Sequence, residues 1–332
     1  SVSLLFYKPA GQASDLFKSL SGRENSDIYI IFAADKPPLR QAASRHGSNK
    51  FVFAPGLHCL CPENNDTMES LKELYKIGNG PSSSHTMGPK KAAERFAERC
   101  HDADAYRVTL YGSLAATGKG HLTDAAILSV LASLAPTEIV WKPEVVLPFH
   151  PNGMLFEGLK AGNVADSWTI YSIGGGALAN ETSRLETPHS IYPLTTVSEI
   201  KAWCSHEGKT YWEYVTDCEG PEIWDYLDEI WTVMCETIQR GLNNDGVLPG
   251  GLKVARKAST YWVKSKSYTD SLKSRAQIYA YALATSEENA SGGTVVTAPT
   301  CGSCGVVPAV LYHLANSRNF LRIRILRALA TA

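Results

Sequence analysis

The 332-residue sequence lacks any apolar run close to the roughly 18 residues of a membrane span. It also lacks an excess of basic residues, because 32 Lys and Arg stand against 33 Asp and Glu, so the basic surface of a nucleic-acid-binding protein is not expected. The opening residues show no basic leader followed by a cleavage-like segment, so no signal peptide is predicted. These absences together favour a cytoplasmic protein that binds neither a membrane nor a nucleic acid.

Cysteine is sparse, with eight residues at irregular spacing, which argues against a secreted disulfide scaffold. Cys301 and Cys304 form a C-x-x-C pair, and a closed zinc site would need a second pair that the sequence does not have. The pair is compatible with a redox dithiol, with half of a zinc site, with part of an iron–sulfur site, or with small buried thiols.

The composition, 44% hydrophobic and 20% charged, is that of a globular protein, and at roughly 150 residues per domain the length predicts two domains. Residues 1–67 show no clear period and are treated as an unassigned extension before Met68. Alternating strand and helix patterns predict an α/β domain over 68–205, and longer amphipathic segments predict a helical domain over 215–332. The expected fold class is therefore α+β. The sequence stops inside a helical pattern, which suggests a truncated C-terminus.

The expected elements follow from hydrophobic periodicity and from the positions of Gly and Pro. Helices are expected at 90–100, 124–134, 221–242 and 269–283, and strands at 106–112, 140–148, 155–157 and 168–173.

The segment 80–89, Gly-Pro-Ser-Ser-Ser-His-Thr-Met-Gly-Pro, is the strongest local signal. Its hydroxyls and backbone N–H groups lie just before a helix and suit a carboxylate, and its histidine is the nearby group that moves protons near neutral pH. A plain Ser-rich helix cap is the alternative. The candidate residues are Ser82, Ser83, Ser84, His85 and Thr86.

A second glycine-rich segment, 112–121, ends in Gly-Lys-Gly-His. It is not a phosphate-binding Walker loop, because five residues separate the first two glycines and Gly120 follows the lysine. Lys119, His121 and Asp124 still suit an anionic ligand, although an ordinary strand-to-helix turn fits the pattern as well.

Two further turns, at 150–153 and 172–176, contain glycine and would allow a ligand to approach the backbone closely. The glycine triplet raises the possibility of a pyridoxal phosphate enzyme, which needs a Schiff-base lysine. No Ser-x-Lys segment in a glycine-rich, basic context supports that possibility.

Taken together, the motifs resemble the iron–sulfur-dependent L-serine dehydratases (L-serine ammonia-lyases) of the single-chain type. The matching stretches cover residues 68–332 almost throughout and occur in the family's order. They are KIGNGPSSSHTMGPKKA, LYGSLAATGKGHLTDAAI, HPNGM, YSIGGGAL, LPGGLKVARKA and SEENASGGTVVTAPTCGSCGVVPAVLYHL.

The resemblance implies a small domain related to the serine-binding regulatory domain of some phosphoglycerate dehydrogenases, followed by an all-helical catalytic domain with a 4Fe-4S cluster. It implies conversion of L-serine to pyruvate and ammonia, a reaction of amino-acid catabolism that feeds gluconeogenesis. One cluster iron without a cysteine ligand would act as a Lewis acid on the substrate. The complete protein is expected to be a homodimer.

The resemblance also implies roles for residues. His85 is the expected acid–base catalyst, and the hydroxyls of Ser82, Ser83, Ser84 and Thr86 are expected to hold the substrate. Lys119, His121 and Asp124 are expected to support the pocket from the small domain, and Asn289 and Thr300 from the helical side.

Cys304, or alternatively Cys301, would be the first cluster ligand, and the others would lie beyond Ala332. Because a cluster with one open iron needs three thiolates, this polypeptide is expected to be a fragment. A non-catalytic serine-binding or regulatory module is the alternative function.

Overall fold

The computed structural model describes residues 68–181 and 190–332. The predictions for residues 1–67 fall outside this part of the chain. The described residues up to Ala330 belong to one compact unit, and every contact discussed below lies within it.

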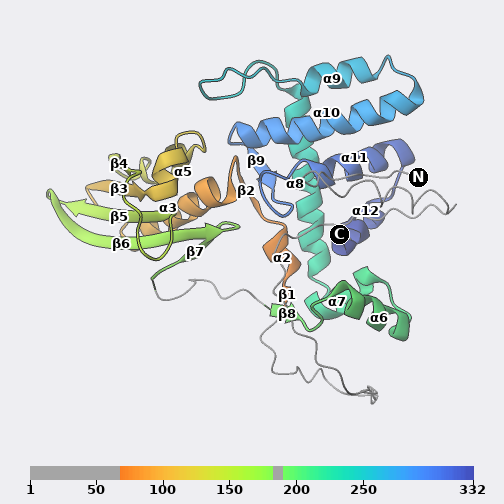
Figure 1. The fold of residues 1–332 in the computed structure, drawn as a ribbon, viewed down its shortest axis with the longest axis horizontal. Coiled ribbons are helices and arrows are strands. Elements are labelled where there is room, and N and C mark those ends of the chain that lie inside the picture. The colour runs from red at the N-terminus through yellow and green to blue at the C-terminus, as the bar shows by residue number, and fades with distance from the viewer. Residues whose placement is uncertain (1–67, 182–189) are drawn as a thin grey trace, which may run out of the picture. The chain divides into compact units, whose positions relative to one another are not determined.

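A five-stranded sheet with strand order β4-β3-β5-β6-β7 forms the core of the α/β part (Figure 1). Strand β3 pairs parallel with β4 and antiparallel with β5, and the remaining neighbours are antiparallel. The strands are β3 (Ala105–Tyr111), β4 (Thr137–Lys142), β5 (Gly153–Lys160), β6 (Asn163–Gly174) and β7 (Ala177–Ala179).

Helices α3 (Gly88–Arg99) and α5 (Thr123–Leu131) pack against each other and cover one face of this sheet (Figure 1). Ala92, Ala93 and Phe96 of α3 are buried because positions three and four apart share one helix face. The Phe96 ring lies 5.5 Å from that of Phe156 in β5. This packing closes the α/β core and leaves the start of α3 at the edge where the glycine-rich turns lie.

Most of the expected elements are confirmed, with two corrections. The strand expected at 140–148 ends at Lys142, because Pro143 has no N–H to donate to a sheet. The glycine-rich segment after β3 is not a simple turn, since a short helix α4 (Gly112–Thr117) forms within it.

The C-terminal part is built around the 21-residue helix α8 (Ile223–Asn243). Its buried face repeats every three or four residues, at Ile223, Leu227, Ile230, Met234 and Ile238, as an amphipathic helix requires. The other helices are α6 (Val197–Glu207), α7 (Tyr211–Glu219), α9 (Ala258–Ser265), α10 (Asp270–Ala290), α11 (Val306–Arg318) and α12 (Arg322–Thr331). None of the described helices is long and apolar enough to cross a bilayer.

The resemblance implies an all-helical C-terminal domain, but the C-terminal part also contains a strand. A short strand β9 (Thr294–Val296) follows α10 and pairs antiparallel with β2 (Ile77–Asn79), as Figure 1 shows. A smaller ladder joins β1 (Met68–Glu69) to β8 (Ser190–Tyr192), and a short helix α2 (Leu71–Leu74) lies between β1 and β2. The expected α+β class is confirmed, and the domain boundary between 205 and 215 stays a prediction.

Candidate functional site

The Ser-rich segment forms a single π-helical turn, η1 (Ser83–Met87), that leads directly into α3. Ser82 caps this turn, because its hydroxyl accepts a hydrogen bond from the backbone N–H of His85 at 3.2 Å. The helix-cap interpretation is therefore correct for Ser82. It does not account for the side chains of Ser84 and His85, which point to other partners.

Both ring nitrogens of His85 lie against hydroxyl groups. Nδ1 is 2.9 Å from Ser84 Oγ, and Nε2 is 3.1 Å from Ser113 Oγ at the start of α4. Partial burial lowers the pKa of His85 below the usual histidine value, and the nearby His121 lowers it further. The ring is therefore neutral at neutral pH, which is the state a general base requires.

Further contacts hold the turn against the glycine-rich segment of the small domain. Thr86 Oγ1 donates to the backbone oxygen of His121 at 2.7 Å, and Thr123 Oγ1 donates to that of His85 at 2.6 Å. The rings of His85 and His121 have centroids 4.8 Å apart. Thus the first and second motifs meet in space around His85.

Two residues expected to support this pocket have other partners. The ammonium of Lys119 lies 5.5 Å from the ring centroid of Trp141, and the carboxylate of Asp124 accepts from the N–H of Ala125 at 2.9 Å. Their roles toward a ligand remain predictions.

Asn289, from the last turn of α10, reaches the Ser-rich turn from the helical side. Its Nδ2 donates to the backbone oxygen of Pro81 at 3.3 Å, whereas its buried Oδ1 has no hydrogen-bond partner among the described residues. A buried acceptor without a donor costs free energy, so this atom is suited to a ligand group. A Cβ on Gly80 would lie 2.2 Å from Asn289, so glycine is needed for this close approach.

The cysteine loop lies next to the same turn. Cys301 Sγ is 3.6 Å from Met87 Sδ, and Cys301 and Cys304 are both buried with Val295 beside them. Burial raises the pKa of Cys301 to about 11 and that of Cys304 to about 12. Thr300 is exposed and bonds Ser303 within its own loop, with its Oγ1 3.1 Å from Ser303 Oγ.

The described residues do not by themselves form a cluster site. No group of three or more His, Cys, Asp or Glu side chains suited to a metal occurs in 68–181 or 190–332. The raised thiol pKa values are those of a protonated pair, and a bound cation would favour the thiolates. Two thiols are fewer than the three that a cluster with one open iron requires.

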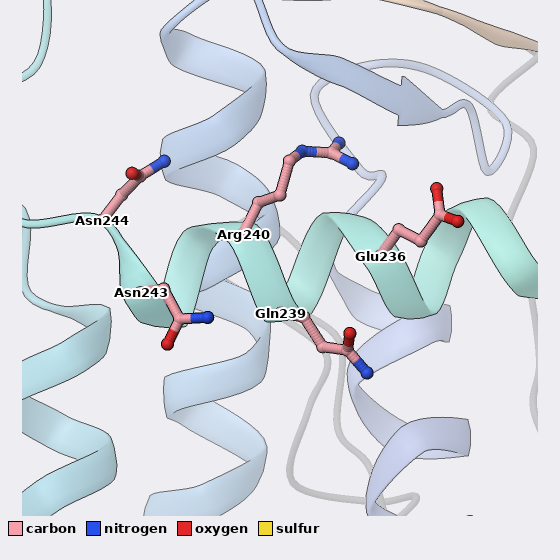
Figure 2. Close-up of a pocket in the computed structure, with 5 residues that line it drawn as sticks. All are labelled: Glu236, Gln239, Arg240, Asn243 and Asn244. Carbon is pink, nitrogen blue, oxygen red and sulfur yellow. The ribbon is translucent and has the colours of Figure 1, made fainter.

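Two hollows lie outside the His85 cluster. One, of about 510 Å³, is lined by four polar residues in the last turns of α8 and by Asn244 directly after it. Figure 2 shows Arg240 and Gln239 extending to different sides of the helix. None of the predicted site residues lines it. The other, of about 390 Å³, adjoins Met87 and carries three lysines against one glutamate, which favours an anion.

Sequence analysis missed Ser113, Thr123 and Ser172 as parts of this region. Ser172 is fully buried, its Oγ has no hydrogen-bond partner in the described part of the chain, and a Cβ on Gly88 would lie 2.2 Å from it. Ser113 lies in the first turn of α4, just after the end of strand β3, and the ends of strands often present side chains to a site. The sequence signal for Ser113 is its place directly after Gly112 at the end of an expected strand.

Comparison with known proteins agrees with this arrangement. Residues 70–140 match the family described as serine dehydratase beta chain. The chain is 35% identical over 302 residues to L-serine dehydratase 1 of Escherichia coli (strain K12) and 36% identical over 301 residues to L-serine dehydratase TdcG of the same organism. It is 35% identical over 300 residues to the L-serine dehydratase of Streptomyces coelicolor.

Each of these alignments covers 74% of this chain and 66% of the relative, so the chain spans slightly less than two thirds of their length. An identity of 35–36% over about 300 residues defines a protein family rather than a shared fold alone. The chain belongs to the L-serine dehydratase family.

Proposed function

We propose that the full-length protein containing this chain is an L-serine dehydratase that converts L-serine to pyruvate and ammonia. One observation carries the proposal. The antiparallel pairing of β2 with β9 brings the His85 turn beside the segment that contains Asn289 and the two cysteines. The relatives that this chain matches at 35% identity are named L-serine dehydratase.

The reaction removes a proton from Cα and hydroxide from Cβ of serine, which together leave as water. The resulting aminoacrylate takes up water and yields pyruvate and ammonia. His85 serves as the base for the Cα proton, because its ring is neutral at neutral pH and faces the hydroxyl-lined side of the turn. The hydroxyls of Ser82 and Ser84 orient the substrate, which removes much of the entropic cost of the step.

Asn289 is the proposed contact on the helical side, since its unpaired Oδ1 suits the ammonium group of an amino acid. The remaining predicted site residues complete the proposal for the substrate pocket: Ser83, Thr86, Lys119, His121, Asp124 and Thr300.

A 4Fe-4S cluster is part of the proposal for the full-length protein, with Cys304 or Cys301 as one ligand. When bound, such a cluster supplies a Lewis acid that makes the β-hydroxyl a better leaving group. The described residues do not supply three thiolates for such a cluster, so further ligands would have to come from elsewhere in the full-length protein. Cytoplasmic location and a homodimer complete the proposal.

Replacing His85 tests the function directly. In the full-length protein, prepared without oxygen, His85→Gln should lower kcat for L-serine by about 10²- to 10⁴-fold, the usual contribution of a general base. In the wild type, kcat/KM should fall on the acid side with a pKa below the ordinary histidine value, because protonation removes the base.

His101→Gln is the matched control, because His101 is an exposed histidine of the same part of the chain. It should leave kcat and the pH profile unchanged. Pyruvate release should be measured together with iron and sulfide content. Serine binding without turnover in protein that contains iron and sulfide would contradict the proposal and favour a regulatory module.

A further inference from the structure

Ser113 contacts the His85 ring from a separate element. It is the second residue of α4, which directly follows β3, and its Oγ lies 3.1 Å from Nε2 of His85, 28 residues away in the sequence. Among the described residues, that nitrogen is the hydrogen-bond partner of the Ser113 hydroxyl.

The backbone around Ser113 is held firmly in place. Gly112 has a left-handed φ of +48°, and a Cβ there would lie 2.6 Å from the backbone oxygen of Pro151. The N–H of Gly112 donates to Val145 O at 2.8 Å, and the N–H of Ser113 donates to Pro151 O at 3.0 Å. The hydroxyl is therefore presented by a turn whose position does not depend on His85.

Ser84 contacts the other ring nitrogen of His85, Nδ1, but unlike Ser113 it belongs to the same turn as the histidine. It is the residue next to His85 on the same turn, so it moves with the ring rather than fixing it. Its Oγ, 2.9 Å from Nδ1, is also 3.5 Å from that of Ser82, so the hydroxyls proposed to hold serine lie on the Nδ1 side. In the proposed pocket, the substrate therefore lies on the Nδ1 side of the ring.

We propose that Ser113 is a positioning residue that accepts the Nε2–H of His85 and so leaves Nδ1 as the basic nitrogen toward the substrate. A neutral imidazole carries one proton, and the hydrogen bond made by one nitrogen determines which tautomer is present. The catalytic part of this inference rests on the proposed function. The tautomer of His85 can be measured without turnover.

The other charged groups near the turn do not perform this role. His121 faces His85 and disfavours its protonation through charge repulsion. Asp124 at the start of α5 accepts from Ala125 N, and Lys90 of α3 donates to Asn79 Oδ1 at 2.8 Å. The backbone of Ser113 raises the pKa of His85, against the effects of burial and of His121. A hydroxyl that accepts the Nε2–H favours the protonated ring in the same direction.

The test uses ¹⁵N-labelled protein and long-range ¹H–¹⁵N spectra, with the His85 signals identified by their loss in His85→Gln. Above its pKa, wild-type His85 should show the Nε2–H tautomer. Ser113→Ala should give a mixture of tautomers and a lower His85 pKa, whereas Ser113→Thr should restore both. Ser129→Ala, which removes a hydroxyl that bonds Ala126 O in α5, should change neither.

In the full-length enzyme, Ser113→Ala should lower kcat by about tenfold or more with little change in KM, a part of the usual general-base contribution. A wild-type Nδ1–H tautomer would overturn the inference even if no Ser113 variant folded, and so would a tautomer unchanged in Ser113→Ala. A protein that shows the expected tautomers but does not turn over serine would overturn the proposed function and leave the positioning role of Ser113 intact.

Discussion

At the scale of single residues, the buried carboxylate of Glu288 shows how the structure holds charge away from solvent. Its Oε1 accepts from Asn244 Nδ2 at 2.7 Å and from Arg256 Nη1 at 3.0 Å, and its Oε2 lies 3.4 Å from Arg240 Nε. Arg256 is itself only 10% exposed. This network joins the loop after α8 to the end of α10, next to the Asn289 contact.

Removing this carboxylate should destabilise the protein strongly. In Glu288→Ala, Arg256 keeps a buried charge without its partner, so the free energy of unfolding should fall by about 3–5 kcal/mol. Urea denaturation followed by circular dichroism measures the change. The exposed pair of Lys209 and Asp217 provides the control, because Asp217→Asn should not change the midpoint measurably. Equal midpoints for the two variants would show that the network does not stabilise the fold.

At the scale of elements, helices α8 and α10 approach each other closely at Gly241. A Cβ at that position would lie 2.3 Å from the backbone oxygen of Ala284, and a backbone atom cannot give way as a flexible side chain can. The small residue lets the two 21-residue helices pack directly, and α10 carries Asn289 in its last turn. The spacing of these helices thus affects the site.

Gly241→Ala should therefore destabilise the protein, although alanine is the better helix former. Overpacking should cost about 1–3 kcal/mol and outweigh the helix-propensity gain of about 1 kcal/mol. Gly251→Ala is the matched control: it has open space around its Cβ and lacks a left-handed φ, so it should be neutral or slightly stabilising. Thermal unfolding measures both, and a Gly241→Ala protein at least as stable as the wild type would contradict the close approach.

At the scale of the whole molecule, the site exists because the α/β and helical parts are joined at β2 and β9. Beyond the strand ladder, Gly80 N donates to Gly293 O at 3.1 Å, and Asn79 Nδ2 donates to Gly292 O at 3.0 Å. These bonds place the turn with His85 beside the segment with Asn289 and the cysteines.

Gly80→Ala should weaken this junction, because its Cβ would lie 2.2 Å from the backbone oxygen of Asn289. Amide hydrogen exchange should become faster in β2 and β9 and stay unchanged in β5, which belongs to a separate hydrophobic core. Gly302→Ala, with no close contact for its Cβ, should leave all three strands unchanged. If Gly80→Ala does not speed exchange in β9, the close packing is not what holds the two parts together.

The sequence by itself determined the α+β class, most of the helices and strands, and the motifs that identify the family. Periodic burial and helix caps are local properties, so they can be recognised along the chain. The end of β4 was misjudged although Pro143 marks it, and α4 was missed because its six residues are too few for a periodic signal.

Only the tertiary structure decided which residues act together. Ser113 and Asn289 lie 28 and 204 positions from His85 in the chain, yet the first touches its ring and the second touches its turn. The β2–β9 pairing joins segments more than 200 residues apart, and no local pattern in either segment specifies the other. The contacts of a site depend on packing between distant segments, whereas a motif records only the residues that its own segment contributes.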